Sequence, residues 1–147
     1  MIYQARKTLL ISLLGILLLG FLSACSAQSQ SNNLKMMPMD KMPAEVRTAP
    51  SVVQQAYQFA AANPNIMQRI PCYCGCGNIG HTSNYSCYIK SSDANGKLIF
   101  DDHALGCSLC VSITQDTMRL LQQGKSVSEI KAYIDSTYSQ YGKSNMP

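Results

Sequence analysis

Six of the seven cysteines in this 147-residue chain lie between Cys72 and Cys110, and its only two histidines lie in the same stretch. Three of these cysteines alternate with other residues, a fourth stands alone, and the last two form a CxxC pair. The candidate metal ligands are Cys72, Cys74, Cys76, Cys87, Cys107 and Cys110, with His103 ranked ahead of His81. Thiols and imidazoles at such spacings are typical of a soft-metal site, a disulfide framework or a redox pair.

The spacing leaves these three interpretations open. Cysteines two positions apart rarely bond to each other, so Cys72, Cys74 and Cys76 each need a distant cysteine or a metal ion. Cys107 and Cys110 fall at an expected helix start, where free N–H groups favour thiolate and thiol–disulfide exchange. Three structural disulfides would also account for the six thiols, in many possible pairings. Because thiolates are soft ligands, we favour a soft metal ion, copper as Cu(I) first and zinc next.

A second group of sulfur atoms precedes the cysteines. Four methionines lie within Leu34–Pro43 beside two prolines, which oppose regular structure. These are Met36, Met37, Met39 and Met42. Thioethers suit Cu(I), so the segment is a candidate for metal capture. The alternative is a tether whose methionines rest against the domain.

The N-terminus predicts the compartment. Arg6 and Lys7 precede an apolar run, Leu9–Leu22, that is short for a membrane span and typical of a signal peptide. Leu22-Ser23-Ala24-Cys25 resembles a bacterial lipoprotein processing site, which implies that Cys25 is lipidated. We therefore expect a lipid-anchored protein on the extracytoplasmic face of the bacterial cell membrane. Ordinary signal cleavage, leaving Cys25 as a free thiol, is the alternative.

The remaining sequence predicts how the thiols are positioned. We expect a signal peptide over 1–24, a lipidated cysteine and flexible Met-rich tether over 25–43, and one small domain over 44–147. The fold class expected is α+β and mainly helical, with a Cys-rich loop, a short β-hairpin and two C-terminal helices. Hydrophobic periodicity and turn signals predict helices over 50–63, 107–123 and 126–138 and a hairpin around Asp93–Gly96.

Charge and motif content limit the classes of binding partner that the protein is expected to have. The net charge is +4 and no run of basic residues is present, which argues against nucleic acid. The sequence contains no HExxH, GxSxG or phosphate-binding loop, so no motif in it indicates hydrolysis. Asp101 and Asp102, beside His103, are expected to be solvated turn carboxylates, with support of the His103 imidazole as the alternative. The partners expected are the membrane through the lipid anchor, a soft metal ion, and an exported or membrane metal-handling protein.

The cysteine motifs also carry a family resemblance. Pro71-Cys72-Tyr73-Cys74-Gly75-Cys76 resembles the signature of the PCYCGC-motif bacterial lipoproteins, and the likeness continues through Gly80-His81 and Cys87-Tyr88. It extends through His103-Ala104-Leu105-Gly106-Cys107-Ser108-Leu109-Cys110 and covers most of residues 50–141. The resemblance implies an exported, membrane-tethered protein in which the six thiols and two histidines form one unit. The resemblance does not assign a catalytic activity or catalytic residues.

Overall fold

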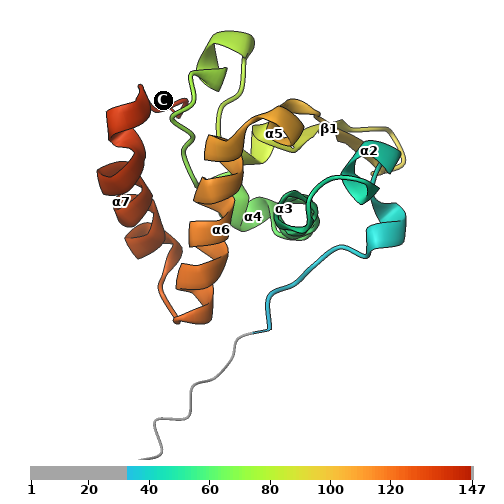
Figure 1. The fold of residues 1–147 in the computed structure, drawn as a ribbon, viewed down its shortest axis with the longest axis horizontal. Coiled ribbons are helices and arrows are strands. Elements are labelled where there is room, and N and C mark those ends of the chain that lie inside the picture. Colours follow the sequence, from blue (N-terminus) through green and yellow to red (C-terminus); the bar gives the residue numbers. More distant parts are fainter. Residues whose placement is uncertain (1–32, 147) are drawn as a thin grey trace, which may run out of the picture. The chain divides into compact units, whose positions relative to one another are not determined.

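The fold is taken from a computed structural model, which describes residues 33–146. These residues belong to one compact unit, Ser31–Pro147 (Figure 1). The predicted signal peptide, Cys25 and the first residues of the predicted tether lie outside the described residues. No helix within 33–146 combines the length and the apolar character needed to cross a membrane.

Three long helices build the framework: α3 (Ser51–Ala62), α6 (Ser108–Gln122) and α7 (Val127–Tyr138). Helix α6 runs through the middle and packs against both α3 and α7 (Figure 1). The shorter described helices are α2 (Ala44–Arg47), α4 (Pro64–Met67) and α5 (His103–Gly106), with 3-10 turns η2 (Met39–Lys41), η3 (Cys76–Ile79), η4 (Asn84–Cys87) and η5 (Ser139–Tyr141). The prediction of a small, mainly helical α+β domain is confirmed.

Local sequence signals explain where the long helices begin and end. Pro50 is the N-cap residue of α3. Its ring restricts φ, which is −53° here, and the chain enters the helix at Ser51. Gly124 follows α6 with a φ of 77°, a left-handed conformation that suits glycine and ends the helix. At α7 both hydrogen bonds of the predicted capping box between Ser126 and Glu129 are present.

The β-hairpin leads the chain into the second half of the cysteine region. Strands β1 (Ile89–Ser92) and β2 (Leu98–Phe100) pair antiparallel, with Ile89 opposite Phe100. Just after β2, the main-chain oxygen of Asp101 accepts a hydrogen bond of 2.8 Å from the Tyr57 hydroxyl of α3. The end of the hairpin is thereby fixed to the helical framework immediately before His103.

The hydrophobic core continues directly into the cysteines. Tyr57 and Phe59 of α3, Ile113 of α6, and Ile130 and Ile134 of α7 are fully buried. Cys72, Cys87 and Cys110 are equally buried and belong to the same cluster of core residues. Half of the thiols therefore occupy positions that apolar side chains fill in most domains.

The methionine segment differs from the flexible tether that the sequence predicts. Met42 is only 2 % exposed, and Met36, Met37 and Met39 pack against the core. The Met37 N–H donates to the Gln58 main-chain oxygen at 3.0 Å, and the Gln58 side chain donates to the Met37 oxygen at 2.8 Å. These two hydrogen bonds hold the segment against α3, which agrees with the alternative that its methionines rest against the domain.

Candidate metal centre

The structure brings the six thiols and the two imidazoles into one cluster. Cys72 Sγ lies 3.4 Å from both Cys74 Sγ and Cys110 Sγ, and Cys110 Sγ lies 3.0 Å from Cys107 Sγ. Cys76 Sγ lies 3.7 Å from Cys87 Sγ. All eight predicted residues fall into overlapping groups whose donor atoms lie within 4.8 Å of one another. These Cys/His groups could hold a metal ion.

Two glycines shape the first cysteine run. Gly75 and Gly80 have φ angles of 84° and 91°, and they bracket the short turn η3 that begins at Cys76. Glycine adopts this left-handed conformation without the steric cost that other residues incur. The two reversals leave Gly77, Asn78 and Ile79 in solvent while Cys76 remains buried. These turns therefore keep the Cys76 thiol in the interior, while Cys74 stays half-buried.

The C-terminal segment also holds this loop, which the sequence did not indicate. The Asn145 side-chain oxygen accepts from the Cys72 N–H at 2.7 Å, and the Asn145 N–H donates to the Cys72 oxygen at 3.0 Å. Asn145 Nδ2 also donates to Cys76 Sγ at 3.4 Å. In Figure 1 the C-terminal segment lies beside the green loop over residues 71–80, which we call the cysteine loop. A single asparagine thus contacts two of the clustered cysteines, and no local signal at Asn145 predicts it.

Helix α6 positions the CxxC pair, as predicted. Cys107 is the N-cap residue, and its sulfur accepts a hydrogen bond of 3.4 Å from the Cys110 N–H. The Cys110 main-chain oxygen accepts hydrogen bonds from the Tyr88 hydroxyl, the Asn84 side chain and the Thr114 hydroxyl, at 2.9, 3.3 and 3.1 Å. This buried network ties η4, which carries Cys87, to the first turn of α6.

The two histidines pack against each other, and each faces a different part of the cluster. Their rings meet edge to face with centroids 5.1 Å apart. His103 Nε2 lies 3.4 Å from Cys74 Sγ. His81 Nδ1 is buried and has no hydrogen-bond partner within residues 33–146. Because a buried nitrogen without a partner is costly, this atom suits a ligand such as a metal ion.

Asp101 does not behave as the solvated turn carboxylate that the sequence predicts. Its Oδ2 lies 3.7 Å from His81 Nε2, and its side chain is only 18 % exposed. Its Oδ1 accepts a hydrogen bond of 2.9 Å from the His103 N–H. Asp102, in contrast, is exposed as expected. A carboxylate beside the outer nitrogen of a histidine is a common support for metal-binding imidazoles.

The spacing of the donors suits a soft metal ion without large rearrangement. Donors bound tetrahedrally at about 2.3 Å lie about 3.8 Å from one another. The sulfur–sulfur and sulfur–nitrogen contacts of the cluster measure 3.0 to 3.7 Å. Disulfide sulfurs lie about 2.05 Å apart, and all six cysteines within the described part of the chain are free. The closest pair, Cys107 and Cys110, needs to separate by about 0.8 Å to enclose an ion, and the other contacts by about 0.1 to 0.4 Å.

Contacts within the cluster lower the pKa of some thiols and raise the pKa of others. The Cys110 thiol donates to Cys107, which lowers the pKa of Cys107 to about 5 and raises the pKa of Cys110. The neighbouring Cys110 thiol also lowers the pKa of Cys72 and that of Cys76. Burial raises the pKa of Cys74. Three of the thiols are thereby predisposed to the thiolate form that binds metals.

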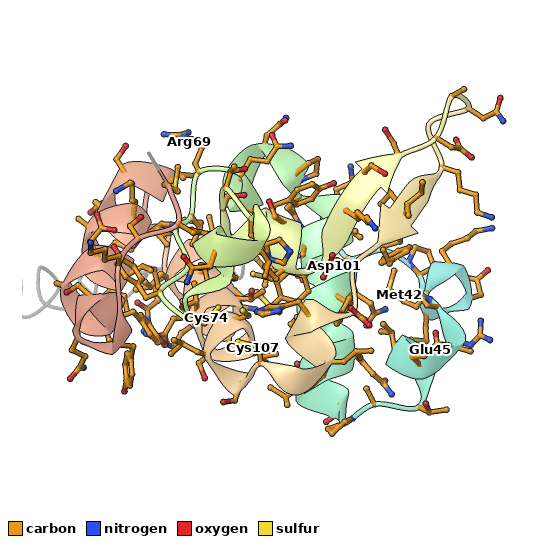
Figure 2. The ribbon with its side chains drawn as sticks, turned by 90° about the horizontal axis from the view of Figure 1, so that it is seen from above. Met42, Glu45, Arg69, Cys74, Asp101 and Cys107 are labelled. Atoms are coloured by element: carbon orange, nitrogen blue, oxygen red, sulfur yellow. The ribbon has the colours of Figure 1, made fainter. Side chains whose placement is uncertain are left out.

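The cluster is buried on most sides but reachable from solvent at two places. Cys74 and Cys107 are half-buried, and Figure 2 shows them close to each other, Cys74 from the cysteine loop and Cys107 from the start of α6. An open hollow of about 620 Å³ lies next to His81, between the glycine-rich loop and the C-terminal segment. These openings give solvent access to ligands that are otherwise part of the core.

The predicted methionine ligands lie elsewhere. In Figure 2, Met42 lies beside Glu45 on the right of the view, Cys74 lies left of the centre, and Asp101 lies between them. Met37 lines a shallow hollow with Lys41 and residues of the hairpin. Metal capture by Met36, Met37, Met39 and Met42 therefore stays a prediction, and the structure gives Met42 a packing role.

The fold and the site together define a small, mainly helical domain with a cysteine- and histidine-rich centre. The family model described as a protein of unknown function with PCYCGC motif matches residues 17–146. The chain therefore belongs to this family, as its cysteine motifs predict. No curated protein and no solved structure matches the chain.

Proposed function

We propose that this protein is a lipid-anchored, extracytoplasmic metal-binding protein that handles or detoxifies a soft metal ion, copper before zinc. The observation that carries the proposal is the convergence of all six thiols and both histidines, with neighbouring donors 3.0 to 3.7 Å apart. Packing alone does not explain this convergence, because a buried imidazole nitrogen needs a partner and His81 Nδ1 has none within the described residues.

Copper is favoured by the chemistry of the donors. Thiolates are soft ligands that prefer Cu(I), and a Cys-rich set with one or two imidazoles also suits Zn²⁺. Cys107, whose pKa is lowered to about 5, lies at an accessible edge beside Cys74. An accessible thiolate allows ligand exchange with an exported or membrane metal-handling protein. Binding at this edge therefore supports transfer as well as storage.

Membrane attachment is proposed from the sequence at Cys25. The apolar run before it and the small residues at the junction favour processing as a lipoprotein, with acyl chains on the cysteine. Each buried methylene contributes about 0.8 kcal/mol, so several chains give a stable anchor. Cys25→Ala is expected to move the protein from the membrane fraction to the soluble fraction. Retention of this variant in the membrane fraction would contradict lipid anchoring at Cys25.

Metal binding is tested on protein purified without oxygen. We expect six reactive domain thiols after metal removal, tight binding of Cu(I) in competition with a chromophoric chelator, and weaker binding of Zn²⁺. Magnesium serves as the control, because it prefers oxygen ligands and should not compete. Failure to bind either soft ion, with all thiols reduced, would overturn the proposal. Absence of reactive thiols would favour a disulfide-stabilised structural or interaction lipoprotein instead.

Thiol–disulfide exchange is a second candidate because of one observation. Cys107 and Cys110 Sγ are 3.0 Å apart at a helix start, and the N-terminal thiol of the pair has the lowered pKa. This arrangement suits a nucleophilic cysteine and a buried partner. An oxidoreductase should reduce a model disulfide and lose this activity in Cys107→Ser. Metal binding without reductase activity would exclude this candidate.

A further inference from the structure

We infer that the centre holds two metal ions linked through the Cys72 thiolate, rather than a single ion. This inference rests on the proposed function and specifies how many ions the same site takes. A tetrahedral ion uses four donors, and the cluster offers eight. A single ion would leave four of these thiols or imidazoles, in or beside the core, without a bound ion.

The donors separate into two four-membered groups. The first consists of Cys74, His103, Cys107 and Cys110, and the second of Cys76, His81, Cys87 and His103. Only His103 belongs to both groups. Its Nε2 contacts Cys74 Sγ at 3.4 Å, which assigns this imidazole to the first group. The second group is then left with two thiols and His81, and it needs a fourth donor.

Cys72 supplies that donor and also reaches the first group. It forms one group of mutually close donors with Cys74 and Cys76, and another with Cys87 and Cys110. Its sulfur is therefore close to two members of each four-donor group, and it is fully buried. A thiolate carries several lone pairs and can bind two ions at once, so the first ion takes Cys72 together with three of the four donors of its own group. Two bonds of about 2.3 Å to one sulfur place the ions less than about 4.6 Å apart.

His81 supports the existence of the second position independently of the sulfur contacts. Its buried Nδ1 lacks a hydrogen-bond partner in the described part of the chain, while its Nε2 faces the carboxylate of Asp101. A carboxylate–imidazole pair with the other nitrogen free is the usual arrangement around a bound ion. The first group, which already has four donors, leaves this nitrogen unused.

The test is the number and separation of Cu(I) ions on the full processed chain, purified without oxygen in detergent. We expect titration with Cu(I) and native mass spectrometry to give at least two ions per chain, and X-ray absorption to give a copper–copper distance below about 4.6 Å. One ion per chain would overturn the inference and leave the proposed function intact. No bound ion would overturn both. Two ions without a short copper–copper distance would overturn the bridge.

Variants assign the two positions. Cys107→Ser and Cys87→Ser should each lose one ion, because each removes a donor of one group only. Cys72→Ser should lose the short copper–copper distance, because its sulfur is the proposed link. Ser108→Ala, an exposed neighbour of Cys107, is the matched control and should keep both ions. Equal loss of all copper in Cys107→Ser and Cys87→Ser, with the fold intact by circular dichroism, would contradict two separable positions.

Discussion

At the scale of single residues, the centre combines thiols that readily lose a proton with thiols that keep one. Cys107 accepts hydrogen bonds from both the thiol and the main-chain N–H of Cys110, at 3.0 and 3.4 Å. Both bonds favour the thiolate of Cys107, and the donor thiol correspondingly holds its proton. Metal binding must displace this shared proton. Affinity should therefore depend on pH through the pair rather than through either cysteine alone.

Alkylation of the reduced, metal-free protein should reveal the lowered pKa of Cys107. Because its pKa is about 5, reaction with iodoacetamide should be constant near neutral pH and decline as the pH falls through about 5. The reaction rate of an ordinary thiol, whose pKa is about 8.5, declines as the pH falls below about 8.5. Peptide mapping by mass spectrometry isolates the Cys107 signal. In Cys110→Ala, which removes the main donor, the midpoint should move toward the ordinary value. A midpoint near 8.5 in the unmodified protein would contradict the hydrogen-bonded pair.

Asp101 is expected to act through His81. Its carboxylate lies 3.7 Å from His81 Nε2 and stabilises the N–H tautomer that leaves Nδ1 free for an ion. Asp101→Asn should weaken soft-metal binding by at least about tenfold, the usual effect of removing such a support. The asparagine retains an oxygen for the His103 N–H, so the fold should persist. Competition with a chelator measures the change.

The adjacent carboxylate provides the control for this prediction. Asp102→Asn removes the same charge one residue away, but its side chain is exposed and forms no cap hydrogen bond with α5. We expect it to leave metal affinity unchanged within about twofold. Equal weakening in both variants would show that general electrostatics, not the contact between Asp101 and His81, sets the effect.

At the scale of elements, two segments distant in sequence hold the cysteine loop. Helix α6 and η4 are joined through the Thr114 hydroxyl, which Tyr88 and Asn84 contact at 2.7 and 2.8 Å. The Asn84 N–H also donates to the main-chain oxygen of Ile70, just before the loop, at 2.7 Å. On the other side the C-terminal segment pairs with Cys72 through Asn145. Because the loop has little regular structure of its own, these contacts determine where its sulfur atoms lie.

At Gly142 the C-terminal segment passes close to the loop. A Cβ atom added there would lie 2.8 Å from the Tyr73 main-chain oxygen, which a backbone atom cannot easily avoid. Gly142→Ala should therefore push the segment off the loop and lower the free energy of unfolding by about 1–3 kcal/mol. Urea denaturation measures the loss. Gly106→Ala is the control, because a Cβ atom there meets nothing within 4 Å. Equal stability of the two variants would contradict the close approach.

These elements differ in how well the sequence predicts them. The helices α3, α6 and α7 and the β-hairpin carry local signals such as periodic apolar residues, Gly124 and the Ser126 capping box, and all of them are confirmed. The convergence of the cysteines was expected from their clustering. The position of Asp101 beside His103 offered a local signal for a supporting role, but its contact with His81 and the role of Asn145 join distant segments, which no local pattern encodes. Met42 was expected in a tether because prolines flank it, but burial against the domain prevailed.

At the scale of the whole domain, the cluster takes the place of part of the core. Its eight donors come from the cysteine loop, η4, α5 and the first turn of α6, and three of its sulfur atoms are fully buried. The chain has no tryptophan and only three phenylalanines, so its apolar core is modest. A small domain of this kind gains from a metal or covalent link between its segments. Ion binding should therefore stabilise the fold itself and not only the loop.

Loading with a soft ion should raise the melting temperature of the reduced protein. An ion that binds only the folded state, at a free concentration 1,000 times its Kd, adds about 4 kcal/mol. In a domain of this size such a gain shifts the melting temperature by on the order of 10 °C. Cu(I) and Zn²⁺ should both produce the shift, and Mg²⁺ at the same concentration should not, because it prefers oxygen ligands. Cys72→Ser should reduce the shift, since its sulfur contacts both donor groups. If neither soft ion changes the melting temperature of the reduced protein, and a reductant lowers the melting temperature of protein purified in air, disulfides rather than metal ions stabilise this core.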